Sequence, residues 1–314
     1  MKFTKQALPL PAQVAKFKSR GLFVPDSAAA EHYLRHIGYY RLSAYALPLQ
    51  QHGMPGKPFK AGASFDDIVN LYRFDRELRL LATDAIERIE VAVRSVIVNE
   101  MSVRHGPHWF MDAVHFNGGV SRFKHPELLD KIDRELNIPA GKTAPTKQHH
   151  EVFINHYYAK YTTPYLPPAW VIAETLTLGS WSMIFEHLRV TAERKIVAAH
   201  FGVDEQVLRS WLHALAHLRN LCAHHARVWN RQFVIKVIVA KKHAAFLKVN
   251  DRFYTFAVVM YDLMQRIAHG TGWHERLAVL LGQHPFVAPI AMGFPPGWKA
   301  EPFWGLDRTE DFSI

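Results

Sequence analysis

The stretch DEQVLRSWLHALAHLRNLCAHHARVWNR, residues 204–231, is the most strongly patterned segment of the chain. Asp204 supplies an N-cap, and apolar residues recur after it at three- and four-residue steps, which predicts an amphipathic helix continuing to about Asn230. On a helical wheel the apolar arc holds Leu215, Leu218, Leu221, Cys222, Val228 and Trp229, together with His225. The opposite arc is basic and free of carboxylates, and it holds His213, His217, Arg219, Asn220, Ala223, His224, Arg227, Asn230 and Arg231.

Helical patterns extend over most of the chain on both sides of this segment. Ser64, followed by Asp66 and Asp67, is expected to begin a long helix that runs to about Val103. Shorter helices are expected over residues 12–19, 27–37, 152–161, 168–178, 180–188, 192–201, 252–269 and 274–281. The β-branched residues 234–239 favour a short strand, with a final packed helical turn as the alternative. Part of the region 118–150, which loses helical periodicity, is expected to be a surface loop.

These patterns predict an all-α fold in three parts. Residues 1–60 are expected to form a small N-terminal helical unit, residues 61–282 a helical core, and residues 283–314 an irregular strap, rich in Pro and Trp, that packs on the core. A connector rich in Gly and Pro, residues 53–58, separates the first two parts. No apolar run reaches the length of a membrane span and no signal-peptide core follows Met1, so a cytoplasmic protein without membrane contact is expected. The single cysteine, Cys222, excludes an internal disulfide framework and a Cys-rich zinc module.

The charge of the chain favours a polyanionic partner. Its formal net charge is +10, and residues 206–250 contain no Asp or Glu but eight Lys and Arg residues. Such a run either forms a solvated basic face or contacts phosphates, from which it releases counterions.

Arg219 and His224 on the basic arc are candidates for cleaving a phosphodiester bond in RNA. That reaction needs groups that transfer protons near neutral pH and a cation that holds the phosphoryl oxygens, which His and Arg supply. His225, on the apolar arc, is expected to be a buried core histidine, and Cys222 a small core residue. Because Arg219 and His224 lie about 140° apart around a helix, a second copy facing the first across a two-fold interface is expected to complete the site.

The segment from Arg219 to His225, continuing to Arg231, resembles the Arg-(four to six residues)-His signature of HEPN-type ribonucleases. More narrowly, the chain resembles the AbiD/AbiF-type abortive-infection family of bacterial phage-defence proteins. Further matching segments cover nearly the whole chain: 20–22, 38–45, 74–79, 87–90 and 292–295, with Trp298 and Trp304.

The resemblance implies a HEPN-type helical bundle that cleaves RNA without metal or cofactor, as a homodimer, leaving a cyclic phosphate and a 5′-hydroxyl. By position, Arg219 would bind the phosphate, His224 would transfer the proton and Asn220 would orient them. His217, Arg227 and Arg231 on the basic arc are candidates for RNA binding. Tyr40 and Arg41 offer an aromatic face and a cation to RNA, although packing of the N-terminal helices explains them equally well.

Three alternatives to this ribonuclease fit the same sequence. A non-catalytic RNA-binding or protein-binding module would have the same charge distribution without turnover. A toxin held inactive by a separate antitoxin, or an enzyme released by a phage-derived trigger, is also compatible. A metal-dependent hydrolase would use His213, His217 and His224, but Ala214 stands where a zinc peptidase motif has its Glu.

Overall fold

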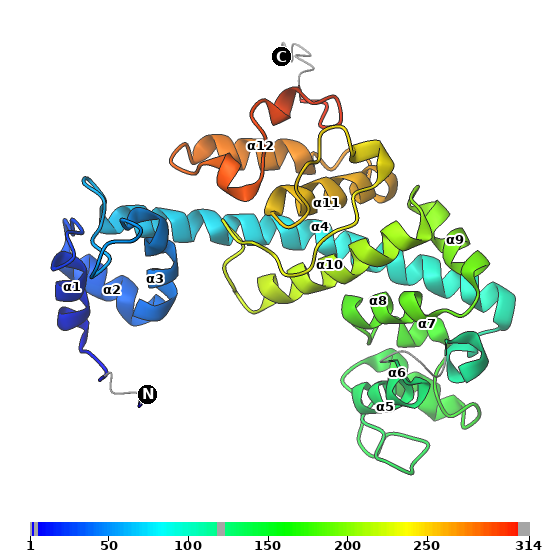
Figure 1. Cartoon of the computed structure of the whole chain (residues 1–314). Helices are drawn as coiled ribbons and strands as arrows, with labels where there is room; N and C mark the ends of the chain where they lie inside the picture. Colours follow the sequence, from blue (N-terminus) through cyan, green and yellow to red (C-terminus); the bar gives the residue numbers. More distant parts are fainter. Residues whose placement is uncertain (1, 3–5, 118–122, 307–314) are drawn as a thin grey trace, which may run out of the picture.

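One long helix organises the molecule. The computed structural model describes residues 2, 6–117 and 123–306, and within them α4 (Phe65–His105) runs for 41 residues, or about 60 Å. The Ser64 side chain accepts a hydrogen bond from the Asp67 amide while the Asp67 carboxylate accepts one from the Ser64 amide, so a capping box fixes its first turn. The predicted start at Ser64 and the predicted length are confirmed. Figure 1 shows α4 crossing behind the other helices, which pack along it.

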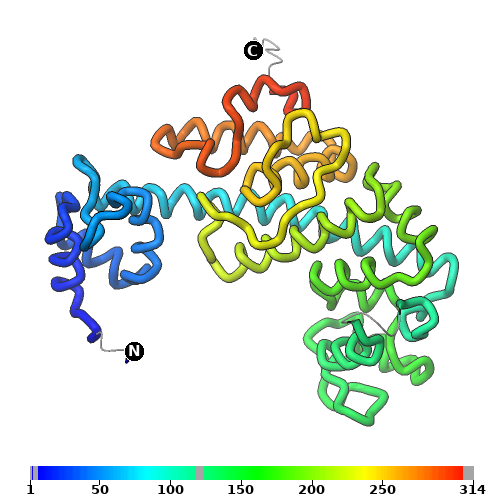
Figure 2. Tube along the Cα trace, viewed as in Figure 1, coloured from blue at the N-terminus to red at the C-terminus, as the bar shows by residue number. Residues whose placement is uncertain are grey.

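The N-terminal unit packs at the start of α4 (Figures 1 and 2). It consists of α1 (Leu10–Lys18), α2 (Ser27–Ile37), α3 (Tyr39–Ala46) and the 3-10 turn η1 (Leu47–Leu49). The Asp26 carboxylate caps α2 by accepting from the amides of Ala28 and Ala29. The helices expected over 12–19 and 27–37 are therefore present, and α3 joins them.

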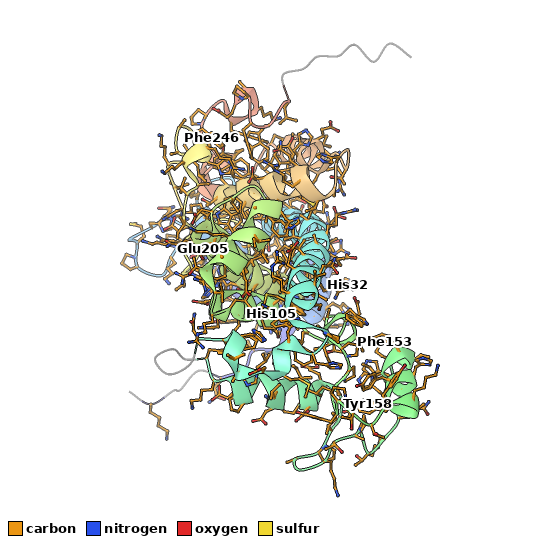
Figure 3. All side chains as sticks on the ribbon, turned by 90° about the vertical axis from the view of Figure 1, so that its right-hand side faces the viewer. His32, His105, Phe153, Tyr158, Glu205 and Phe246 are labelled. Carbon is orange, nitrogen blue, oxygen red and sulfur yellow. The ribbon has the colours of Figure 1, made fainter. Side chains whose placement is uncertain are left out.

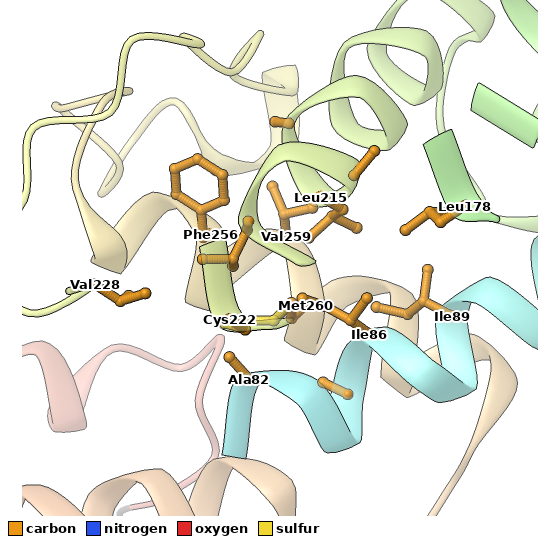
Figure 4. Close-up of a cluster of buried hydrophobic side chains, with 14 of the residues drawn as sticks. Ala82, Ile86, Ile89, Leu178, Leu215, Cys222, Val228, Phe256, Val259 and Met260 are labelled. Carbon is orange, nitrogen blue, oxygen red and sulfur yellow. The ribbon is translucent and has the colours of Figure 1, made fainter. Parts of the chain in front are cut away.

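The central layer places α8 (Leu178–His187), α9 (Thr191–His200), α10 (Glu205–Ala223) and α11 (Phe253–Ile267) along α4. Helix α12 (Trp273–Gln283) packs on α4 as well, and the Trp273 indole donates to the Leu81 carbonyl across 2.8 Å. Figure 4 shows apolar side chains of α4 meeting those of α10 and α11, among them Ala82, Ile86, Ile89, Leu215, Cys222, Val259 and Met260. Each fully buried Leu or Ile of this kind contributes about 1.5–3 kcal/mol to folding.

The far end of α4 carries a peripheral lobe, residues 107–117 and 123–177 (Figure 1). It contains the turns η2 (Trp109–Met111) and η3 (Ala113–His115) and the helices α5 (His125–Glu135), α6 (Val152–Lys160) and α7 (Ala169–Ile172). The expected loop is confirmed for residues 139–148, which form turns and irregular backbone and are mostly exposed, while α5 occupies part of the region where periodicity was weak. Residues 118–122 of that region lie outside the described part of the chain.

Two connections after α10 differ from expectation. Residues 234–239 form neither a strand nor a helical turn, because the Val237 amide donates to the Asn250 carbonyl and the Ile238 amide to the Ser210 hydroxyl, with no neighbouring strand to pair with. The turn η4 (Lys241–His243) follows. The segment from 284 to 306, where part of the strap 283–314 was expected, contains the turns η5 (Pro289–Met292) and η6 (Trp298–Ala300); residues 307–314 lie outside the described part of the chain. Trp298 and Trp304 are buried against the body, and the Trp304 indole donates to the Tyr254 hydroxyl.

The all-α prediction is confirmed, since twelve α-helices and only isolated β-bridges occur among the described residues. None of the helices in that part of the chain is both long enough and apolar enough to span a lipid bilayer.

Candidate active site

Helix α10 ends earlier than its sequence pattern predicts. His224 is its C-cap and His225 follows with a left-handed backbone (φ +54°), so the expected continuation to Asn230 is wrong. The amide of His225 donates to the Cys222 carbonyl and the amide of Ala226 to the Leu221 carbonyl, the two hydrogen bonds of a Schellman motif. This position usually carries glycine, because a side chain there is strained.

The N-terminal unit holds this turn in place. The Arg41 guanidinium donates to the backbone carbonyl of His225, and the Arg227 guanidinium donates to the Ala44 carbonyl across 3.3 Å. Both contacts join α3 to the residues that follow α10, so α3 fixes the backbone from which His225 projects. Burial lowers the pKa of Arg227, and the nearby Asp75 partly offsets that effect. Through its bond to the Ala44 carbonyl, Arg227 helps to hold α3 against the segment after α10.

A cavity of about 440 Å³, here called the arginine cavity, lies between α4 and the end of α10. Three arginines and one histidine line it, with no carboxylate among the lining residues: Arg76, Arg79, Leu80, Thr83, Arg219, Cys222, Ala223 and His225. The prediction that His225 is a buried core histidine is therefore wrong, because the helix ends before His225 and the side chain is exposed. The wheel projection failed here because it continued a regular helix past its last turn.

The three arginines of the arginine cavity differ in their partners. Arg79 is buried and paired with Asp75, whereas Arg76 and Arg219 make no hydrogen bond or ion pair with any described residue. Two guanidinium groups are therefore free to bind an anion in this cavity, and their planar forks of donors match phosphate.

Cys222 also lines the arginine cavity but is poorly suited to act as a nucleophile. Burial raises the pKa of its thiol to about 11, so the thiolate is scarce near neutral pH. Its packing against the apolar side chains of α4 and α11 (Figure 4) agrees with the prediction of a core residue.

Asp75 of α4 links α3 and the segment after α10 to α4, beside the arginine cavity. Its fully buried carboxylate accepts from the Tyr45 hydroxyl at 2.6 Å, from the amides of Trp229 at 2.6 Å and Val228 at 3.0 Å, and from the Arg79 guanidinium. Burial and this carboxylate raise the pKa of Tyr45 far above its usual value, so the phenol remains a donor. Asp75 thus ties α3, α4 and the segment after α10 into one rigid frame.

Asn220 and His217 lie on another side of α10, in a cavity of about 360 Å³ here called the histidine cavity. It is lined by Gly179, Ser182, Met183, Glu186, His213, Ala216, His217, Asn220 and Ile235. Burial lowers the pKa of His217, with further contributions from Arg231 and His213, and its Nε2 atom is buried without a partner. The predicted basic arc is therefore divided: Arg219 faces one cavity, and Asn220 faces the other.

The remaining predicted site residues are placed as follows. His224 is exposed at the end of α10 and lines neither of these cavities; its amide donates to the Asn220 carbonyl across 2.9 Å. The Arg231 guanidinium donates to the Arg227 carbonyl, and Tyr40 on α3 is 92% exposed. Within the described residues no cluster of three or more His, Cys, Asp or Glu side chains has the arrangement of a metal site, so His213, His217 and His224 do not converge.

The sequence pattern gave no indication that Arg76, Arg79 and Thr83 belong to the same site as Arg219. They lie on α4, more than 130 residues away, and only the packing of α10 against α4 brings them together. Their spacing of three and four residues places them on one face of α4, but the same spacing occurs in any surface ion pair.

Comparison with known proteins gives one match. The family model described as Abi-like protein matches residues 32–230, which include α3, α4, all of α10 and every residue of the arginine cavity. No curated protein and no solved structure matches the chain.

Proposed function

The chain belongs to the Abi-like protein family, and from that membership and the arginine cavity we propose that it is a metal-independent RNA endonuclease of an abortive-infection defence against phage. Its helical core would then be of the HEPN type that the Arg219-to-His signature resembles. RNA cleavage in this chain would take place in the arginine cavity.

The observation that carries the proposal is the pair of unpaired guanidinium groups beside an imidazole. Arg76 and Arg219 are the free cations, His225 lines the same wall, and no lining residue is acidic. A phosphodiester carries one negative charge, and a dianionic phosphorane forms when it is attacked. Guanidinium groups stabilise negative charge, so this pair would favour the dianionic phosphorane over the monoanionic substrate.

The reaction needs no water or metal in its first step. A base removes the proton of the ribose 2′-hydroxyl, and the resulting oxygen attacks the adjacent phosphorus. The bond from phosphorus to the 5′-oxygen then breaks, and an acid protonates the leaving oxygen. The products are a 2′,3′-cyclic phosphate and a 5′-hydroxyl. Arg219 is assigned to phosphate binding, in agreement with its position in the signature.

Two histidines compete for the proton transfer. The spacing of the signature fits both, since four residues separate Arg219 from His224 and five separate it from His225. By resemblance to the family, His224, the C-cap of α10, is assigned the proton transfer and Asn220 is assigned to orient the pair. The cavity favours His225, which lines it together with Arg219 and whose carbonyl accepts from Arg41. Because an acid and a base are both required, a second copy facing the first, in a homodimer, would supply the remaining group.

Cleavage of labelled single-stranded RNA by purified variants tests these assignments. Arg219→Ala is expected to slow cleavage by about 10²–10³-fold. The alanine variant of the histidine that transfers the proton is expected to slow it by about 10²–10⁴-fold. His52→Ala, which removes an exposed histidine just before the connector, is the matched control and should cleave like wild type. Excess EDTA should leave the rate unchanged.

The outcomes separate the candidates. A loss with His224→Ala alone or with His225→Ala alone identifies the proton-transfer residue, and a loss with both supports an acid and a base from the adjacent pair. Full cleavage by both histidine variants would refute the proposed mechanism. Retarded RNA without products would instead support a binding module, and a small protein that co-purifies and blocks cleavage would identify an antitoxin.

A further inference from the structure

A third cavity, here called the aromatic cavity, lies in the peripheral lobe beyond the end of α4. Its volume is about 450 Å³, and it is enclosed by the start of the lobe, α6, the loop 161–168 and α7. Rings form most of its wall, chiefly those of His108, Phe153, His156, Tyr157, Tyr161 and Trp170. The volume is in the range of pockets that hold small organic groups.

The wall contributed by α6 is fixed before any ligand binds. Phe153, His156 and Tyr157 are spaced by three and four residues, so they share one face of α6. The Tyr157 hydroxyl donates to the Pro164 carbonyl across 2.7 Å, and its ring contacts the Tyr161 ring at 5.2 Å. On the same helix, Tyr158 donates to the Tyr165 carbonyl across 3.0 Å. Figure 3 shows Phe153 and Tyr158 on this helix at the edge of the lobe.

Two large aromatic side chains at this cavity remain accessible to water. Trp170 is 54% exposed and Tyr161 is 52% exposed, although both line the cavity. Aromatic rings left exposed around a concave site are a common mark of ligand contact, because covering them recovers a large apolar area.

The chemistry of the lining restricts what the cavity accepts. No Asp, Glu, Lys or Arg lines it, so a phosphate or a charged side chain has no counterion there. The Nε2 atom of His108 is buried without a hydrogen-bond partner, which is a cost unless a ligand satisfies it. Burial lowers the pKa of His108, against a weaker opposing effect of a backbone hydrogen bond with Leu166, and the ring is therefore neutral near pH 7.

We propose that the aromatic cavity binds an unpaired base of single-stranded RNA, with the base stacked on the exposed rings and its polar edge at His108. A base is flat and uncharged and carries hydrogen-bonding groups on its edge, which matches rings for walls and one unsatisfied imidazole nitrogen. A proline-rich peptide also docks on aromatic grooves, but a proline ring offers no polar edge to His108. The ribose and phosphates remain outside the cavity, which has no charged residue in its lining.

The choice of RNA rests on the proposed function, whereas the capture of a base is a separate claim about another part of the molecule. It identifies single-stranded RNA as the preferred substrate, because the bases of a duplex are stacked and paired and cannot enter the cavity. The aromatic cavity then selects and holds the strand, and the arginine cavity carries the reaction.

Binding of labelled 2′-O-methyl RNA to the full-length chain tests the proposal, since the blocked 2′-oxygen prevents cleavage during the measurement. Trp170→Ala and Tyr161→Ala are each expected to weaken binding of the single strand by between about 5-fold and 100-fold. Phe23→Ala, which removes an aromatic side chain 65% exposed in the N-terminal unit, is the matched control and should bind like wild type. Duplex RNA should bind all four proteins equally. His108→Phe keeps a ring but removes the nitrogen, and it should reduce any preference among the four homopolymers.

Each outcome decides between the two claims. Unchanged single-strand binding by both aromatic variants, or no binding by wild type, overturns base capture. A proline-rich peptide, or free AMP or UMP, that binds the wild-type cavity more tightly than the strand also overturns it. Weakened binding by the aromatic variants, together with no cleavage of ordinary RNA by wild type, supports base capture while the proposed function fails. Normal cleavage by wild type, together with unchanged RNA binding by the aromatic variants, supports the proposed function while base capture fails.

Discussion

Asp75→Asn removes one charge from the frame around the arginine cavity while keeping the size of the side chain. Asp75 is fully buried and accepts from Tyr45, Val228, Trp229 and Arg79. An asparagine retains one acceptor oxygen, but an NH₂ group replaces the other. That NH₂ group faces groups that themselves donate hydrogen bonds. At least one buried donor therefore loses its partner, and the Arg79 guanidinium, only 6% exposed, becomes an uncompensated charge.

The magnitude follows from the burial of both partners. Breaking a buried ion pair by removing one partner costs about 3–5 kcal/mol. Against a typical free energy of unfolding of about 5–15 kcal/mol, the variant should still fold at 25 °C but with a much lower denaturation midpoint. The oxygen that asparagine retains still accepts from the amides of Val228 and Trp229, so the loss falls on the side of the former carboxylate that faces Tyr45 and Arg79.

Urea denaturation followed by tryptophan fluorescence measures the loss, and a double-mutant cycle assigns it to the pair. Arg79→Met alone should also destabilise the chain, because it strands the Asp75 carboxylate. The double variant Asp75→Asn with Arg79→Met should lose less free energy of unfolding than the two single losses added together. The difference, which is the coupling energy, should be about 1–3 kcal/mol. A cost below about 1 kcal/mol for Asp75→Asn, or strict additivity of the two changes, would refute the assignment of Asp75 as the charged centre of the frame.

Three further predictions concern the end of α10. Arg41→Met should leave the melting temperature within a few degrees of wild type but slow RNA cleavage, because the His225 carbonyl loses its donor; equal cleavage would show that α3 does not position the turn. His225→Gly should raise the free energy of unfolding by up to about 1 kcal/mol, since glycine is favoured at a left-handed C′ position, and a calorimetric loss of stability would contradict this. Cys222, with its pKa raised to about 11, should be alkylated by iodoacetamide much more slowly at pH 8 than the same thiol in the urea-unfolded chain, and the rate should climb as the pH approaches 11; fast alkylation at pH 8 in the folded chain would exclude the burial that raises the pKa.

The helices could be predicted where their own sequence carries both the pattern and the cap. Ser64 and Asp67 begin α4, Asp204 begins α10, and the buried stripes that follow continue without interruption. The end of α10 could not be predicted, because His225 adopts a left-handed backbone without the glycine that usually reveals it. The strand expected over residues 234–239 is absent. Their β-branched side chains favour a strand, but the amides of Val237 and Ile238 donate to Asn250 and Ser210 instead of to a neighbouring strand.

The candidate site could be predicted only as far as it lies in one segment. Arg219 was identified from its position beside two histidines on a basic helix. Arg76 and Arg79 join it through tertiary packing alone, and no spacing in the sequence relates them to Arg219. A helical wheel continued past Ala223 places His225 on the apolar arc, but the helix ends there and His225 is exposed. The proton-transfer role of His224 stays a prediction.

The length of α4 fixes the separation of two of the cavities. Thr83 is the last residue of α4 that lines the arginine cavity, and residues just after His105 line the aromatic cavity, so 22 residues of uninterrupted helix, about 33 Å, separate the two. A strand that reaches both must cover that span, and a shorter oligonucleotide occupies only one of them at a time. Affinity and cleavage should therefore rise together at a threshold of RNA length, and inserting turns into α4 should move that threshold upward.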